Sequence, residues 1–121
     1  MTFRADLNVL NLWLDGQHSA YLQVPAHSSV GNTLPLEIGR NGPATGKYWL
    51  GKLDDVRIWN VARQGTEITA TYRTQLSGPQ PGLIANWHFD DSSGTTAADS
   101  TGSGHTATLH GGATFSPDVH P

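Results

Sequence analysis

The longest strand-like stretch, residues 48–60, most constrains the fold of this chain. Within it, residues 53–60 read LDDVRIWN, and side chains alternate between the two faces of a strand. Val56 and Ile58 then share one face with Asp54. This pattern predicts a strand with a core-facing side. It also makes Asp54 a residue to explain, because a lone carboxylate on an apolar face is costly unless it is paired or binds a metal.

A hairpin is predicted near the start of the chain. Leucine alternates with other residues over 10–14, the dipeptide Asp15-Gly16 favours a tight turn, and residues 20–24 resume strand-like character. We expect the leucines to form the buried face. Trp13 shares its face with polar neighbours, so we expect it to face solvent.

Shorter elements complete the pattern. Further strands are predicted at residues 34–38, 83–90, 106–109 and 113–115. In the second of these, Trp87 and Phe89 fall on one face, which we expect to join the core. Residues 91–104 are rich in Ser, Thr, Gly and Asp, which predicts a surface loop.

One short helix is predicted near residues 64–75. Ile68 and Tyr72 have helical spacing, and Glu67 follows Gln64 at the spacing of a capping box. Several Thr residues weaken the helix, so about two turns are expected, held by packing on the sheet.

Composition supports an all-β fold. The chain has 121 residues, of which 36% are hydrophobic, with 14 Gly and 7 Pro. Short strands joined by many turns have this composition, and the length suits one domain. We therefore predict a single antiparallel β-sandwich over residues 1–121.

Charge and residue content exclude several functions. The net charge is -3 and the 7 Lys and Arg form no basic stripe, so no nucleic-acid partner is expected. No apolar run is long enough to span a bilayer, so no membrane insertion is expected. There is no cysteine, which excludes disulfides and thiol chemistry. No signal peptide is recognised after Met1, but the polar, Thr- and Gly-rich composition favours an extracellular location.

Two stretches resemble a known family. Residues 11–16 (NLWLDG), 35–41 (PLEIGRN) and 51–63 (GKLDDVRIWNVAR) resemble the closing part of laminin-G-like domains of the concanavalin A-like lectin/glucanase superfamily. Residues 82–94 and 98–109 resemble the opening strand of such a domain. The resemblance implies a jelly-roll sandwich. A departure is the segment 64–66, QGT, where the family usually has a Ser cap.

The order of the two stretches is reversed. Residues 1–76 resemble the C-terminal half of a module and residues 82–116 its N-terminal strands. The chain is then either circularly permuted or cut across the boundary between two modules. First and last strands of such sandwiches pair, so we expect the two stretches to fold together, with open sheet edges.

The resemblance also implies a metal. Related sandwiches use the Asp of the closing-strand motif for structural calcium, which implies Asp54 as a ligand. Asp90 and Asp99 are the other candidate ligands, because the pairing of the two stretches would bring strand ends together. Calcium takes six to eight oxygen ligands. The alternative is that these aspartates cap turns and accept backbone N–H groups.

No enzyme is predicted. Glycoside hydrolysis needs two carboxyl groups about 5–9 Å apart. The only glutamates, Glu37 and Glu67, lie in different predicted elements, and neighbouring aspartates face opposite ways on a strand. Ser, His and Asp are all present, so a triad stays open, but the chain has no Gly-x-Ser-x-Gly elbow and no zinc motif.

Tryptophans are the candidate ligand-binding residues. Exposed aromatic rings stack on sugar rings, whereas buried ones fill the core. Trp13, Trp49 and Trp59 are the candidates, and Trp87 is assigned to the core. We therefore expect a carbohydrate-binding or adhesion module whose partner is a glycan or an extracellular protein. The alternatives are a structural unit that assembles with another copy or a neighbouring domain through open edges, and a non-catalytic fragment of a secreted glycosidase.

Overall fold

The computed structural model describes residues 1–26, 33–42 and 46–117. Most of its regular structure is β, and all of its strand pairs are antiparallel. In chain order the described elements are β1 (Thr2–Arg4), β2 (Val9–Leu14), β3 (Gln17–Gln23), β4 (Val56–Trp59), α1 (Gly65–Thr71), β5 (Leu83–Trp87), β6 (Thr96–Ala97) and β7 (Ala107–Thr108). The predicted fold class, mostly β with antiparallel sheets and one short helix, is confirmed.

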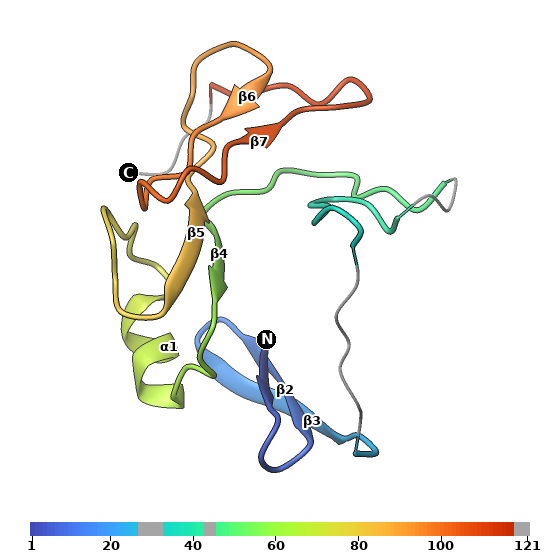
Figure 1. The fold of residues 1–121 in the computed structure, drawn as a ribbon, viewed down its shortest axis with the longest axis vertical. Helices are drawn as coiled ribbons and strands as arrows, with labels where there is room; N and C mark the ends of the chain where they lie inside the picture. Colours follow the sequence, from blue (N-terminus) through green and yellow to red (C-terminus); the bar gives the residue numbers. More distant parts are fainter. Residues whose placement is uncertain (27–32, 43–45, 118–121) are drawn as a thin grey trace.

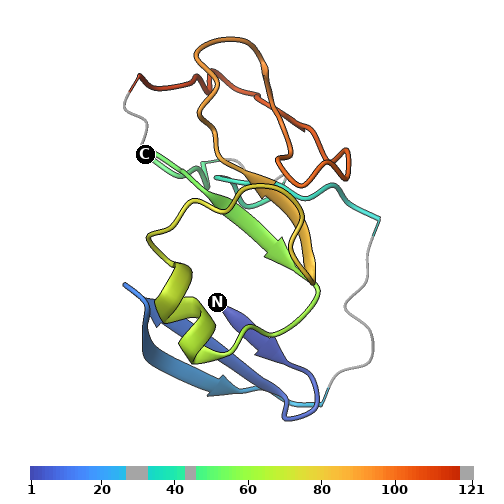
Figure 2. The same cartoon turned by 90° about the vertical axis from the view of Figure 1, so that its left-hand side faces the viewer.

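The strands form three small sheets, β1-β2-β3, β4-β5 and β6-β7. The sheets follow one another along the long axis of the molecule, with β4-β5 in the middle and α1 between that pair and the three-stranded sheet (Figures 1 and 2). No helix among the described residues is long and apolar enough to cross a membrane.

The predicted hairpin is confirmed. β2 and β3 pair in antiparallel register on either side of a two-residue turn, Asp15-Gly16. Both turn residues have positive φ, 50° at Asp15 and 75° at Gly16, as a type I′ turn requires. A side chain at Gly16 would also collide with Tyr72, because a Cβ there would lie 2.6 Å from a ring carbon.

The predicted faces of β2 are reversed. Leu12 and Leu14 are exposed, at 51% and 65%, whereas Trp13 is half-buried. Trp13 lies against α1, since a Cβ at Gly65 would come within 2.5 Å of its ring. The alternation correctly indicates two faces, but the position of α1 decides which face is covered. The prediction that Trp13 faces solvent was therefore wrong.

The two family-like stretches meet at β4 and β5, as expected. The strands pair antiparallel, with Val56 opposite Trp87 and Ile58 opposite Ala85. These four side chains face a core whose buried members are Ala85, Trp87 and Ala97. Phe89 also packs against this core, so the predicted roles of Val56, Ile58, Trp87 and Phe89 are confirmed.

Asp54 does not share the face of Val56. Asp55 has a positive φ of 47°, which breaks the alternation, and β4 begins only at Val56. Asp54 is exposed, and its carboxylate accepts the N–H of Asp55 at 3.0 Å. The prediction of a carboxylate on the apolar face was therefore wrong.

Three other predicted elements differ from the structure. Residues 34–38 and 113–115 form no strand. Near the first of these, the only regular pairing among the described residues is a bridge between Arg40 and Tyr48. Residues 91–104 are not wholly a surface loop: β6 lies within them, and Ala97 is completely buried. Two adjacent small residues, Ala97 and Ala98, in a polar segment gave the sequence pattern no sign of this burial.

Helix α1 is confirmed but shorter than residues 64–75. It begins after Gln64, whose N–H donates to Glu67 Oε2 at 2.7 Å, one half of the expected capping box. Thr69 ties the helix to the hairpin, because its hydroxyl donates to Gly16 O at 2.6 Å.

Candidate ligand-binding site

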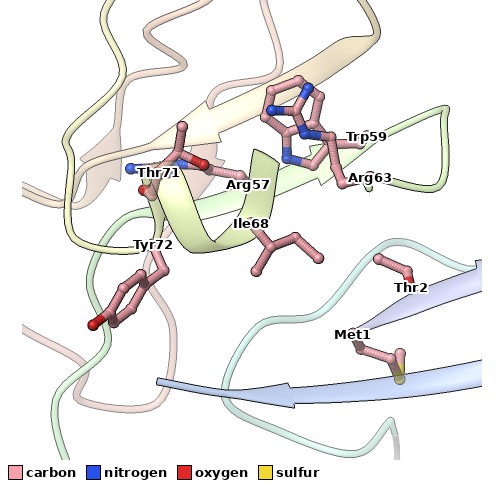
Figure 3. Close-up of a pocket in the computed structure, with 8 residues that line it drawn as sticks. All are labelled: Met1, Thr2, Arg57, Trp59, Arg63, Ile68, Thr71 and Tyr72. Atoms are coloured by element: carbon pink, nitrogen blue, oxygen red, sulfur yellow. Dashed lines mark hydrogen bonds between the residues drawn. The ribbon is translucent and has the colours of Figure 1, made fainter. Parts of the chain in front are cut away.

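A hollow of about 180 Å³ lies between β1, β4 and α1. Its lining residues are Met1, Thr2, Arg57, Trp59, Arg63, Ile68, Thr71 and Tyr72. Figure 3 shows the Arg63 guanidinium over the Trp59 ring, Ile68 on the helix, and Met1 and Thr2 on the opposite side. The hollow therefore combines two aromatic rings, two guanidinium groups and three hydroxyl-bearing side chains, counting Tyr72 as both aromatic and hydroxyl-bearing.

Trp59 provides the aromatic surface. It is half-buried at the end of β4, on the face opposite Val56 and Ile58. The Arg63 guanidinium lies 4.2 Å from the ring centroid, a cation–π distance. Glu67 holds Arg63 in turn at 2.9 Å. One of the three predicted tryptophans thus lies in a hollow, with the Arg63 guanidinium stacked over one face of its ring.

Arg57 fixes the back of the hollow. Its guanidinium donates to Thr71 O at 3.1 Å, to Asp55 Oδ2 at 3.0 Å and to Thr74 O. These contacts fasten the end of α1 to β4. The Nε of Arg57 is buried and has no hydrogen-bond partner among the described residues. Arg57 is therefore a structural member of the site with one unused donor.

The other two tryptophans lie elsewhere. Trp13 packs on α1 and donates weakly to the Thr2 hydroxyl at 3.4 Å. It therefore contacts a lining residue of the hollow without lining the hollow itself. Trp49 is 61% exposed, and its Nε1 donates to Lys52 O at 3.2 Å. It belongs to the segment 46–55 and does not line the hollow. The structure thus separates the three predicted ligand-binding residues into one lining residue, one supporting residue and one exposed loop residue.

The three aspartates predicted to bind calcium do not form a ligand cluster. Within the described residues, no group of three or more His, Cys, Asp and Glu side chains is placed to hold a metal. Asp54 and Asp90 are both exposed, and Asp90 Oδ2 accepts the side-chain amide of Gln75 at 2.6 Å. The residues present therefore do not fit a ready-made calcium site.

Asp99 is already fully hydrogen-bonded. Its side chain is 1% exposed, and it accepts the N–H of Asn86, Thr101 and His105 at 3.0–3.2 Å and the Thr101 hydroxyl at 2.8 Å. Burial raises the pKa of the carboxyl, but these hydrogen bonds outweigh burial and lower the pKa to about 2. The alternative reading, a carboxylate that organises a turn, describes Asp99.

A buried polar cluster lies on the other side of β5. Asn86 is completely buried and its Nδ2 donates to Leu76 O at 2.8 Å. His88 Nε2 also approaches Leu76 O at 2.8 Å and Ser100 Oγ at 3.3 Å. Asp55 Oδ1 lies 3.8 Å from the same nitrogen. Sequence reasoning did not single out this cluster. The signal that could have found it is the alternation along β5, which places the polar residues 86 and 88 on the face opposite Trp87.

This cluster contains Ser, His and Asp but lacks triad geometry. In a triad the nucleophile and the aspartate contact opposite ring nitrogens, so that the aspartate orients the ring while the other nitrogen takes the proton of the nucleophile. Here Ser100, Asp55 and the Leu76 carbonyl all approach Nε2 of His88. The arrangement therefore joins loops together and does not activate the Ser100 hydroxyl.

A sequence model of the concanavalin A-like lectin/glucanases superfamily matches residues 1–69, more than half of the chain. The chain therefore belongs to this superfamily, in its laminin G-like group, and its antiparallel strands and short helix are consistent with a sandwich of that kind. The match runs from β1 into α1 and contains Trp13, Trp49 and Trp59. Comparisons with curated proteins and with solved structures give no match. Membership supports a carbohydrate- or protein-binding module in general terms.

Proposed function

We propose that the chain is a non-catalytic, extracellular binding module that holds a carbohydrate in the hollow beside Trp59. One observation carries the proposal: an aromatic ring lies next to guanidinium and hydroxyl donors in one concave site. Sugar rings offer C–H groups for an aromatic face and hydroxyls for such donors. The superfamily description, which names lectins, supports the same ligand class.

The absence of catalysis is part of the proposal. None of the described residues that line the hollow is Asp, Glu or His, so no general acid or base faces a ligand there. The grouping of Ser100, His88 and Asp55 lies in the other polar cluster, where the Ser and Asp side chains approach the same ring nitrogen. The extracellular location is proposed from the laminin G-like resemblance and from the polar, Thr- and Gly-rich composition.

A glycan array followed by titration tests the ligand. We expect Trp59→Ala to weaken binding of the best array ligand by about tenfold or more, because the stacking surface is lost. The control is Trp49→Ala, which removes a more exposed tryptophan outside the hollow. If Trp49→Ala weakened binding more than Trp59→Ala did, the binding site would instead include Trp49. An array without any hit would overturn the carbohydrate proposal.

Calcium stays a prediction, although the described residues offer no ready ligand set. Anything that binds only the folded state raises the melting temperature. A melt in calcium compared with one in EDTA therefore decides the question, and an unchanged midpoint removes calcium from the proposal.

A second candidate function is self-assembly by strand addition. Strands β1 and β3 are the edges of a three-stranded sheet, and open edges can accept another strand. Proline at an outward-facing N–H of β3 would block this pairing, and loss of oligomers in that variant would favour it.

A further inference from the structure

A row of three side chains crosses the three-stranded sheet beside the hollow. The register places Thr2 opposite Asn11, and Asn11 opposite Tyr21, so the three side chains share one face of the sheet. We call these three residues the cross-strand row. Thr2 also lines the hollow, so the row begins at the site proposed for a carbohydrate and leads away from it, over β2, to the edge strand β3.

The cross-strand row lies on the face of the sheet that carries the hollow. Alternation along β2 puts Asn11 on the same side as Trp13, which packs against α1. Figures 1 and 2 show α1 and the β4-β5 pair on one side of this sheet. The helix leaves the far end of the row open, because Tyr21 is 70% exposed. A ligand that lies in the hollow can therefore continue along the row without crossing to the other face.

The row offers the two kinds of group that hold a sugar. Tyr21 presents an exposed aromatic ring, which can pack on the C–H groups of a pyranose, with a hydroxyl at its tip. Asn11 Oδ1 lies 3.0 Å from Nε2 of His18, and the His18 ring contacts the Trp13 ring edge-on at 5.1 Å, so the Asn11 side chain is held in place. Among the described residues, neither the two donors of this amide nor the Tyr21 hydroxyl has a hydrogen-bond partner.

The next row on the same face is occupied by contacts within the chain. Its members are Arg4, Val9 and Gln23. Arg4 forms an ion pair with Asp6 at 2.6 Å, and the Gln23 amide donates to the carbonyls of residues 7 and 8. The donors of that row are thus already used, whereas those of the cross-strand row are not. The unused groups are polar and uncharged, which suits a ligand rich in hydroxyls better than an apolar protein surface or a charged polymer.

We propose that the carbohydrate site extends from the hollow along the cross-strand row, so that the module takes an oligosaccharide and not a single sugar. This inference rests on the function proposed for the hollow. Neighbouring strands lie about 4.8 Å apart, so the row from Thr2 to Tyr21 adds about 10 Å to the site, or about two sugar rings. A single pyranose in the hollow cannot reach that far. A longer chain can contact Trp59 with one ring, Tyr21 with another, and the Asn11 amide with the hydroxyls between them.

Affinity as a function of ligand length tests the extension. The probes are the best ligand of the glycan array and its terminal monosaccharides, titrated by calorimetry. The wild type is expected to bind the full ligand at least about tenfold more tightly than any of the monosaccharides. Tyr21→Ala is expected to weaken binding of the full ligand about tenfold and to leave monosaccharide binding unchanged, because only the far end loses its ring. Trp59→Ala should weaken both. The control is Tyr48→Ala, an exposed tyrosine outside the three-stranded sheet, which should change neither.

Nuclear magnetic resonance gives a second readout that does not depend on affinity. Binding of the full ligand is expected to shift the signals of the Asn11 side-chain amide and of the Tyr21 ring, and binding of a monosaccharide is not. Equal affinity for the full ligand and a monosaccharide would overturn the extension, as would a Tyr21→Ala variant that binds the full ligand at wild-type strength. In both cases the hollow beside Trp59 would remain the site. An array without any hit would instead overturn the function proposed for the hollow, and the extension with it.

Discussion

The carboxylate of Asp99 accepts the backbone N–H of Asn86 at 3.1 Å, which joins a polar loop to the middle of β5. The same oxygen also accepts the N–H and hydroxyl of Thr101. A loop rich in Ser, Thr and Gly is thus held against the core by one buried charge. The behaviour of this region toward acid and toward substitution follows from that contact.

Acid is expected to destabilise the protein through Asp99. The pKa of its carboxyl is about 2 in the folded state and 3.8 in the unfolded reference, so the unfolded state takes up the proton first as the pH falls. The contribution is complete above about pH 4 and is lost as the pH falls through about 2. Thermal melts between pH 5 and pH 2 measure this. Asp99→Asn should flatten the profile in that window, and an equally steep profile in the variant would contradict the assignment.

Enlarging Ala97 is expected to destabilise the fold. Its side chain is completely buried against Ala85 and Trp87, so Ala97→Leu must push core side chains apart, at a cost of about 1–3 kcal/mol. Urea unfolding measures the loss. Ala98→Leu, at the exposed neighbouring position, is the control and should change stability by no more than about 0.5 kcal/mol. Equal effects of the two changes would mean that residues 91–104 do lie on the surface.

Replacing Gly65 with alanine is expected to destabilise the protein although alanine favours helices. The new methyl would lie 2.5 Å from the Trp13 ring, which must then move, at a cost of about 1–3 kcal/mol. Intrinsic helix propensity alone would stabilise by about 1 kcal/mol. The two effects have opposite signs, so the sign of the change in the free energy of unfolding decides. Thr66→Ala, at the next and exposed position of α1, is the control.

Removing the Arg57 guanidinium is expected to loosen α1 from β4. Arg57→Met keeps most of the side-chain volume but leaves Asp55 and two backbone carbonyls without their donor, at a cost of about 2–3 kcal/mol. Arg73→Met is the control, because Arg73 is exposed and lies over the Tyr72 ring at 5.2 Å. Hydrogen exchange of the helix amides should rise in the first variant only. Unchanged protection would show that Thr69 and Ile68 suffice to hold the helix.

The local features of the fold were predictable from short patterns. Asp15-Gly16 between two alternating stretches fixes a hairpin because both positions must adopt positive φ. Val56 and Ile58 indicate a core face because side chains alternate along a strand. The pairing of β4 with β5 was expected from the family resemblance, which the match over residues 1–69 confirms for the first of these strands.

The candidate site was predicted only in part. Trp59 was named as a ligand-binding residue, and it does line the hollow. Arg57 and Arg63 were not, because each becomes part of the site only when α1 packs beside β4. Asp54 was misjudged because one left-handed residue, Asp55, interrupts the alternation. Aspartate is enriched among non-glycine residues with positive φ, but such residues are uncommon, so the residue type alone does not predict the interruption.

The sequence by itself determines where the chain turns, which stretches alternate, and that the chain belongs to a superfamily of lectins and glucanases. Those properties depend on neighbours along the chain. Only the tertiary structure decides which side of an alternating strand is covered, because that depends on where α1 lies. Trp13 is covered and Leu12 and Leu14 are bare for this reason. The hollow that we propose for a carbohydrate is lined by residues of α1, so it depends on the same placement of the helix.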